Sequence, residues 1–495
     1  NIYTLELGYE INDAWFVDSI TTYNEAGYAY NWDGDITPEP ISVLTDDRLD
    51  KTFSQELRLT FDYENLKGVV GFYYSDLDVV DNSAGGRSIT LTQLGVPTLL
   101  TAPAEYGGLG LPQGLADQVL GIYAQVNPVR LGSEVNYTSA VSSAALFADA
   151  TYSINDNIDI IAGFRYDQES QENEDASFYT IDNAHLLPDP KSYAASNPML
   201  SQLISGLNAN LYAQAQSASG QQPLIDEDFN AFLPKLGLSY HFNSDMTTSF
   251  IYQKGYRSGG VSSNTATSRV YSYEPEYTDN YELSFRSTWL DSSLVVNANL
   301  FYLDWKDQQI NVQLSGNQYD VETRNAGTST VKGFETEVFW YPTENWSVTG
   351  GVGYTKTEFT HFEFKNQGTD VILTGRPFPD APEWTANIAT SYNFDSGIYI
   401  NANANYADSS VPFTNPYAII PNFDPNNEPE NDARVLVNAQ VGYEWSHYKI
   451  WLQANNLLDE EYIENLLSVP GARTESGQAE IGAPRHLSIS FQASF

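Results

Sequence analysis

The sequence predicts an all-β protein, a transmembrane antiparallel β-barrel of about 17 strands. Two alternations lead to this prediction. Short segments along the whole chain alternate apolar and polar residues, and the connections between them alternate between short and long up to the last residue. No break in composition divides the 495 residues, so one large barrel is more economical than several small domains.

The strands are predicted from a side-chain period of two. In the segment 158–167, one face carries Ile158, Ile160 and Phe164, and the other face carries Asp159 and Arg165. Successive side chains of a strand point to opposite faces, so this segment has one apolar and one polar face. Segments 280–289 and 398–406 show the same pattern. A soluble β-sandwich also produces it, so the period alone does not place the chain in a membrane.

The connections distinguish the two folds. Tight turns occur at Asn155-Asp156, Asp291-Ser292 and Ser446-His447, and Asn, Asp and Gly suit such turns because they tolerate left-handed backbone. The long connections cover roughly 25–51, 79–140, 169–229, 259–275, 359–381, 408–432 and 459–483, with a shorter one near 309–319. Short turns on one rim and long loops on the other are typical of outer-membrane barrels.

The two ends of the chain predict an odd number of strands. The last strand, 485–495, follows a long loop, and the first strand leads into a short turn, so both run toward the short-turn rim. Bacterial single-chain barrels have even numbers of strands, and an open edge in lipid leaves backbone groups unpaired. We therefore expect at least one further strand before Asn1.

Composition excludes several functional classes. The formal net charge of -41 excludes a general nucleic-acid binder, because contacts to phosphates need clustered Lys and Arg. The absence of Cys excludes disulfides and thiolate metal sites. Many of the 34 Tyr, 24 Phe and 9 Trp stand near predicted strand ends, which favours aromatic girdles at the two membrane interfaces, with packing in a core as the alternative.

Six single or paired short motifs, in order along the chain, resemble TonB-dependent outer-membrane receptors. Each is weakly specific alone, and together they span most of the sequence. They are Phe53-Ser-Gln-Glu-Leu-Arg-Leu59, Leu233-Pro-Lys-Leu-Gly-Leu-Ser-Tyr240 with Tyr252-Gln-Lys-Gly-Tyr-Arg-Ser-Gly-Gly260, Asn280-Tyr-Glu-Leu-Ser-Phe-Arg286 with Asn299-Leu-Phe-Tyr-Leu-Asp304, Asn325-Ala-Gly327 with Gly333-Phe-Glu-Thr-Glu337, Asn456-Leu-Leu-Asp-Glu-Glu-Tyr462, and the closing strand Gly482 to Phe495 with its terminal Phe.

The resemblance implies a barrel of 22 strands around an N-terminal plug, with the visible strands as the last ones and residues 1–495 as one barrel domain. It also implies active import of a scarce ligand, such as a ferric siderophore complex, across the outer membrane of a Gram-negative bacterium. The partners implied are the TonB complex, reached through an N-terminal region that this sequence lacks, a small-molecule ligand and outer-membrane lipid. No cofactor is implied.

Candidate ligand-binding residues stand at the loop-side ends of the predicted strands. Arg side chains match carboxylates and anionic chelates, and Tyr and Trp stack on rings or sugars. The alternative is a role in the girdle or in loop packing. The candidates are Tyr256, Arg257, Tyr271, Tyr273, Trp305, Arg324 and Arg376.

Other functions remain open alternatives. A barrel without a plug is a passive porin-like channel, and importers of oligosaccharides, vitamins or haem fit the same architecture. A surface receptor in which the long loops are the functional part is a further alternative. An enzyme is not expected, because the sequence offers no defensible pairing of a nucleophile with a base, and the five His show no metal-ligand spacing.

Two of the long loops carry helix-like apolar stripes. The first is Leu200, Leu203, Ile204, Leu207 and Leu211, with Asn197 placed as N-cap and Pro198 in the first turn. The second is Leu115, Val119, Leu120, Ile122 and Tyr123. We expect the stripes either to pack on each other or on neighbouring loops and roof the pore, or to form a docking surface for a partner or a mobile lid.

Overall fold

A computed structural model gives the fold of the chain. It describes residues 1–33, 42–92, 94–103, 108–217, 219–221, 224–264, 269–314, 321–325, 327–366, 369–420, 424–468 and 478–494. Within these residues no helix is long and apolar enough to cross a membrane.

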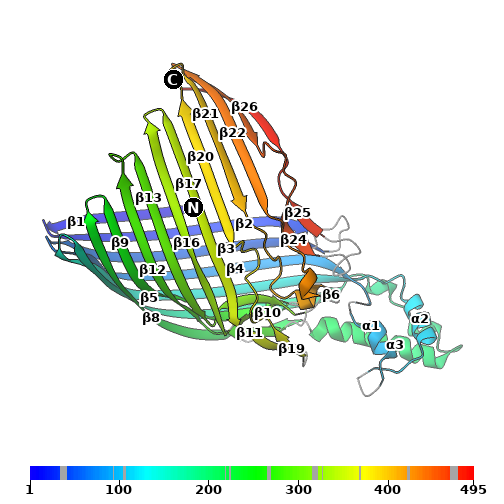
Figure 1. Cartoon of the computed structure of the whole chain (residues 1–495). Helices are drawn as coiled ribbons and strands as arrows, with labels where there is room; N and C mark the ends of the chain where they lie inside the picture. Colours follow the sequence, from blue (N-terminus) through cyan, green and yellow to red (C-terminus); the bar gives the residue numbers. More distant parts are fainter. Residues whose placement is uncertain are drawn as a thin grey trace.

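Seventeen long strands form one antiparallel sheet in which each strand pairs with the next one along the chain (Figure 1). The predicted all-β fold and the predicted number of strands are confirmed. The strands are β1 (Ile2–Asn12), β2 (Trp15–Asp33), β3 (Ser42–Asp62), β4 (Leu66–Ile89), β5 (Val129–Asn155), β6 (Ile158–Ile181), β8 (Ile225–Asn243), β9 (Met246–Arg257), β12 (Glu276–Trp289), β13 (Leu294–Lys306), β16 (Thr328–Thr343), β17 (Trp346–His361), β20 (Trp384–Asn393), β21 (Ile398–Ala407), β22 (Arg434–Trp445), β23 (Tyr448–Asn455) and β26 (His486–Ala493). The two-residue β7 (Gly220–Gln221) also pairs with β6.

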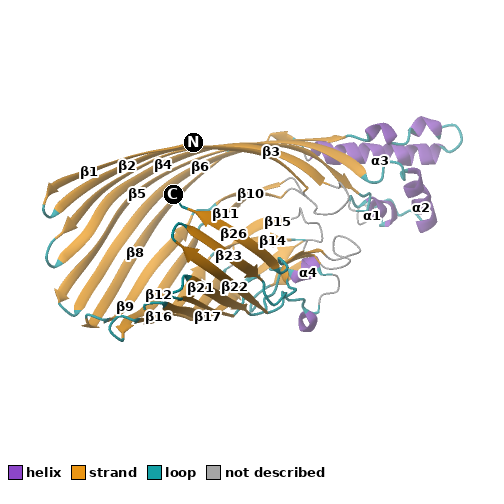
Figure 2. Ribbon diagram, turned by 90° about the horizontal axis from the view of Figure 1, so that it is seen from above, coloured by secondary structure: helices purple, strands orange, loops and turns teal. Residues whose placement is uncertain are grey.

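The sheet is strongly curved, and the strands wrap around a concave side (Figure 2). In the described part of the chain β1 pairs only with β2 and β26 only with β23, so these two strands are the edges of the sheet.

The apolar face of the sheet stays largely exposed among the described residues. Phe250, Leu283 and Leu300 lie side by side on β9, β12 and β13 and are 47%, 44% and 54% exposed. Exposed apolar rows of this size on a protein mark a surface that meets another apolar phase. Their alternation with polar neighbours on the same strands fits the outer wall of a barrel in lipid.

Aromatic side chains stand at both ends of these apolar rows. The rings of Trp340 and Trp346 are 5.8 Å apart at the short-turn end. At the loop end, the ring of Tyr281 is 5.2 Å from that of Tyr252 and 6.4 Å from that of Tyr302. These positions are those of the two girdles that the sequence predicts.

The long connections begin later than predicted, because β3 to β6 continue far beyond the length that crosses a membrane. They have 21, 24, 27 and 24 residues, whereas a spanning strand needs about 9–11. In the extension of β6, for example, residues 169–175 are polar on both faces, so alternation no longer marks the strand. The backbone hydrogen bonds between the strands continue without this alternation.

The two predicted helical stripes form a separate cluster beyond the loop ends of β4 to β6. Its elements are α1 (Val96–Thr101), α2 (Gln113–Ile122), η2 (Ala184–Leu186), η3 (Pro190–Ser192) and α3 (Pro198–Ser217). The backbone N–H of Leu200 donates to Asn197 Oδ1 at 3.1 Å, so the predicted N-cap is confirmed. All predicted stripe residues except Leu115 belong to one apolar core.

This packing decides between the expectations for the stripes. Leu100, Ala116, Val119, Val126 and Ile204 are fully buried within the chain, so the stripes pack on each other and are not available as a docking surface. Both views show the helices beyond the strand ends rather than over the concave side, which differs from the expected roof (Figures 1 and 2).

Shorter elements extend the hairpins at the same rim. They are β10 (Gly260–Asn264), β11 (Arg269–Tyr273), β14 (Gln309–Gln313), β15 (Val321–Asn325), β18 (Glu363–Asn366), β19 (Thr369–Ile372), α4 (Pro416–Ile419), η4 (Pro425–Asn427), β24 (Ile463–Ser468) and β25 (Gln478–Ile481). A second apolar core of Val312, Leu314, Phe359, Phe362 and Leu373 joins the connections that contain β14–β15 and β18–β19.

Candidate functional site

Three of the predicted ligand-binding residues line one pocket at the loop-side rim. Tyr271 and Tyr273 come from β11, and Arg324 comes from β15. Phe362 and Phe364, from the end of β17 and from β18, complete the aromatic part of a cavity of about 320 Å³. Residues far apart in the sequence therefore meet because three neighbouring hairpins extend beyond the sheet together.

Arg324 is held in the pocket by two contacts. Its Nη2 is 2.7 Å from Glu322 Oε2, two residues earlier on the same face of β15, and Glu322 is nearly buried. Its guanidinium also lies 4.8 Å from the centre of the Phe364 ring. The ion pair neutralises the local charge, and the planar cation stacked on a ring leaves an amphipathic wall. Such a wall suits a ligand with rings or hydroxyl groups.

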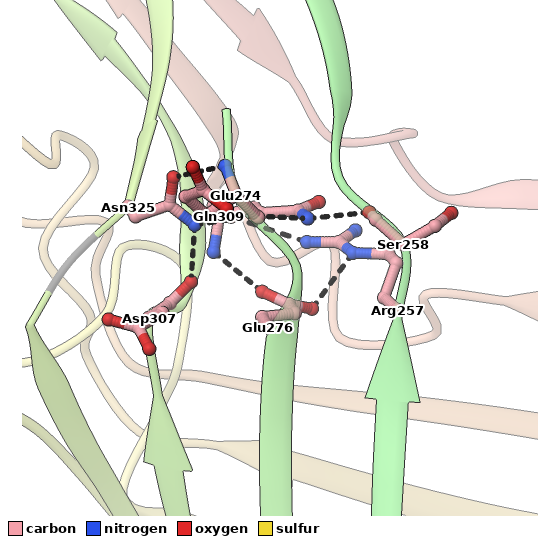
Figure 3. Close-up of polar contacts among 7 residues, drawn as sticks. All are labelled: Arg257, Ser258, Glu274, Glu276, Asp307, Gln309 and Asn325. Carbon is pink, nitrogen blue, oxygen red and sulfur yellow. Dashed lines mark hydrogen bonds and ion pairs between the residues drawn. The ribbon is translucent and has the colours of Figure 1, made fainter. Parts of the chain in front are cut away.

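Arg257 anchors a polar network beside this pocket (Figure 3). Its Nε lies 2.8 Å from Glu276 Oε1, and Glu276 Oε2 accepts from the backbone N–H of Gln309 at 2.5 Å. The Gln309 side chain donates to the backbone oxygens of Ser258 and Glu274 at 2.7 and 3.1 Å. The network therefore fixes the end of β9, the start of β12 and the start of β14 relative to one another.

Asn325 extends the same network toward the pocket (Figure 3). Its Nδ2 donates to the backbone oxygens of Glu274 and Asp307 at 2.8 and 2.7 Å, and its Oδ1 accepts from the backbone N–H of Glu274. Burial raises the pKa of Tyr273, and the positive charge of Arg257 acts in the opposite direction. Tyr273 therefore stays a neutral hydroxyl that can donate to a ligand at physiological pH.

The other three predicted residues lie outside the pocket. The Tyr256 ring packs 5.5 Å from that of Tyr277 on β12. The Trp305 ring meets Phe378 edge-on at 6.2 Å. Arg376 forms a bidentate pair with Glu428 at 3.0 and 2.6 Å and so joins two connections. Ligand binding stays a prediction for all seven candidate residues.

Sequence reasoning missed Glu276, Glu322, Gln309, Phe362 and Phe364. One signal was available for Glu322, because an acid two residues before or after an Arg within a strand shares its face. The pairs Glu56–Arg58 at 2.6 Å and Arg165–Asp167 at 2.6 Å follow the same rule. Gln309 and the two Phe residues reach the site through the packing of separate hairpins, for which the sequence has no local signal.

Comparison with known proteins identifies the architecture. The sequence model of the family described as TonB dependent receptor-like, beta-barrel matches residues 1–457. A curated protein from Acinetobacter baumannii, the probable TonB-dependent siderophore receptor PiuA, is 25% identical over 230 residues, which cover 45% of this chain and 28% of that protein.

Solved structures agree at the level of the fold. The ferric yersiniabactin uptake receptor FyuA from Yersinia pestis has a TM-score of 0.69 at 17% identity, covering 100% of this chain and 61% of that one. The siderophore receptor PiuA from Acinetobacter baumannii has a TM-score of 0.65 at 16% identity, covering 99% of this chain and 63% of that one. The chain thus spans less than two thirds of the length of these proteins. The family whose model matches residues 1–457 consists of outer-membrane proteins of Gram-negative bacteria.

Proposed function

Since this chain belongs to the family of TonB-dependent receptor-like β-barrels, we propose that it forms the wall of an outer-membrane importer, with residues 1–495 as one barrel unit. The proposed activity is the uptake of a scarce ligand such as a ferric siderophore complex, driven through the TonB complex. The names of the similar proteins support this ligand class, since PiuA is a siderophore receptor and FyuA is an uptake receptor for ferric yersiniabactin.

The observation that carries the proposal is the pocket of Tyr271, Tyr273 and Arg324 at the loop-side rim. A ligand arriving from the loop side meets two hydroxyl-bearing rings and a stacked guanidinium on rigid hairpins. Aromatic faces and a small number of placed polar groups are the usual composition of a small-molecule site. The seven candidate residues are therefore proposed as two groups, three that contact the ligand and four that contribute at its edge or hold the hairpins.

Binding of a ferric siderophore complex to the full-length protein in detergent, followed by Trp fluorescence, tests the proposal. We expect Tyr273→Ala and Arg324→Ala each to weaken binding about tenfold, since a contact at a pocket centre contributes on the order of 1–2 kcal/mol. Arg485→Gln is the matched control, because the Arg485–Asp459 pair at 3.2 Å connects the last loop with the last strand. Unchanged binding in both pocket variants would contradict the proposed site.

Conductance of the full-length protein in planar bilayers separates an importer from a passive channel. A gated importer passes no large steady current without its ligand and its energy source. A large steady conductance would show a porin-like channel instead and would overturn the importer. Uptake of radioactive iron by cells with and without a functional TonB complex then tests the energy coupling.

A further inference from the structure

Two lysines stand directly opposite each other on the apolar face of the sheet. Lys332 of β16 is the cross-strand partner of Lys356 of β17, and Tyr302 of β13 is the partner of Lys332 on its other side. The alternation places them on the face of Leu300 and Phe334, which the membrane covers in the proposed function. This is an unusual position in a chain that has 23 basic and 64 acidic residues.

Neither lysine of the pair forms an ion pair among the described residues, whereas the neighbouring Lys306 pairs with Asp279 at 2.8 Å. Two carboxylates share this face on the loop side of the pair, those of Asp304 on β13 and Glu358 on β17, which are the cross-strand partners of Thr330. Asp304 lies 3.8 Å from Lys306. Like charges directly opposite each other destabilise a sheet, so the position favours binding of an external anion.

The position of the two lysines along the strands indicates which anion is near them. Trp340 marks the short-turn end of the apolar rows on β16, and Lys332 lies eight residues from it toward the loops. Eight residues of a strand tilted by about 40° rise about 20 Å, close to the height of the apolar band of such barrels. The lysines therefore lie at the loop-side interface, level with the headgroups of the outer leaflet.

Aromatic rings lie next to the pair on its membrane side. Phe334 and Tyr354 are the next cross-strand pair on this face, with ring centres 6.1 Å apart, and Trp384 lies 4.8 Å from Tyr354. A cation above an aromatic patch matches a lipid whose phosphate is followed by an apolar body.

We propose that Lys332 and Lys356 bind the phosphate groups of an anionic outer-leaflet lipid, with Phe334, Tyr354 and Trp384 contacting its apolar part. The inference rests on the outer-membrane placement in the proposed function, but not on the ligand or on transport. Each ammonium acts as a point charge for phosphate, and the low dielectric of the interface strengthens the attraction.

Native mass spectrometry of the full-length protein tests this lipid site. The probes are a diphosphorylated glycolipid of the outer leaflet and the same glycolipid without phosphates. We expect the double variant Lys332→Gln, Lys356→Gln to bind the phosphorylated lipid about 30-fold more weakly, because each lysine near a lipid surface contributes about a factor of five. Replacement of both by Arg should preserve binding.

The matched control removes two lysines elsewhere. Lys67→Gln with Lys365→Gln changes the net charge equally, and these exposed lysines pair with Asp62 and Asp370 away from this face. Equal binding of the two glycolipids, or an equal loss in the control, would overturn the proposal. Displacement of the lipid by inorganic phosphate below millimolar concentration would show a free-phosphate site and also overturn it.

Iron uptake by the same variants separates this inference from the proposed function. The lipid site predicts weaker lipid binding in the Gln variant while the wild-type protein and the variant take up the siderophore complex at similar rates. Absence of uptake by the wild-type protein would overturn the importer and leave the lipid result standing. Unchanged lipid binding in the Gln variant would overturn the lipid site alone.

Discussion

Apolar side chains are buried in the helical cluster of α1, α2 and α3 but exposed on the apolar face of the 17-stranded sheet, which we call the wall. In the cluster, Val119 and Ile204 are completely buried by other residues of the same chain. On the wall, Leu300 is 54% exposed, and its cross-strand partner Leu283 is 44% exposed. The cluster is stabilised by its own core, whereas the wall relies on a surrounding apolar phase. Replacing an exposed apolar side chain should therefore affect the stability of the two regions differently, and mutations can test this difference.

The largest effect is expected in the core of the cluster. Ile204→Ala removes a completely buried side chain between the two helical stripes and should destabilise the cluster by about 2–5 kcal/mol. Hydrogen exchange of residues 184–217 should rise strongly. The exposed Met199 of the same helix is the control, since Met199→Ala removes little buried area.

The contrast between the two regions requires that the helical cluster can unfold without the sheet. We expect the Ile204→Ala variant to keep the heat-resistant folded sheet in gel electrophoresis, because the core of the cluster includes only the loop-side ends of β5 and β6, with Val129 and Ile181. Loss of the folded sheet together with the cluster would show that the two regions form one cooperative unit.

A second prediction uses two side chains of equal exposure. Leu300 and Met199 are 54% and 59% exposed, and we expect Leu300→Arg to cost about 2–4 kcal/mol and Met199→Arg less than about 0.5 kcal/mol. The reason is that lipid surrounds Leu300 in the proposed function, whereas water surrounds Met199. Denaturant-induced unfolding from lipid vesicles measures both. Equal small costs would place the wall in water and would argue against a membrane-spanning barrel.

A third prediction concerns the start of α3. Asn197→Ala removes the acceptor for the Leu200 N–H and should destabilise the cluster by about 1 kcal/mol. Asn197→Asp should restore most of this, because a carboxylate accepts the same bond and interacts favourably with the helix dipole. Hydrogen exchange in the first turn of α3 is the measurement. If the Ala variant showed the same protection from hydrogen exchange as the wild type, the Asn197 cap would not stabilise the start of α3.

The comparison also separates what the sequence predicts from what it does not. Alternation in 158–167 correctly assigns the two faces of a strand, and the apolar period with Asn197 correctly predicts α3, because both signals are local. The extensions of β3 to β6 were predicted as loops, since alternation no longer marks the strands there.

The candidate site shows the same division. Tyr271, Tyr273 and Arg324 line one pocket at the loop-side rim, because strand order and hairpin direction bring them there, and their binding of a ligand stays a prediction. The pairing of Arg376 with Glu428, 52 residues away, depends on how two connections pack. No period in the sequence specifies such a contact, so packing between loops is the part that required a structure.

The smallest effect tests how the cluster responds to alkali. The buried Tyr123 hydroxyl donates to Asn208 Oδ1 at 2.7 Å and lies 3.1 Å from the Ile204 carbonyl oxygen. Burial raises the pKa of Tyr123 above its usual value near 10. The unfolded cluster then loses this proton at lower pH than the folded cluster. The contribution of Tyr123 to the stability of the cluster is therefore complete below pH ~10 and falls as pH rises through the pKa of the folded state.

Tyr123→Phe should destabilise the cluster by about 1 kcal/mol at neutral pH and weaken the dependence of its stability on pH. Hydrogen exchange of α3 between pH 8 and 11, corrected for the intrinsic rate, measures both effects, and an equally steep decline in the Phe variant would assign the alkaline sensitivity to another group.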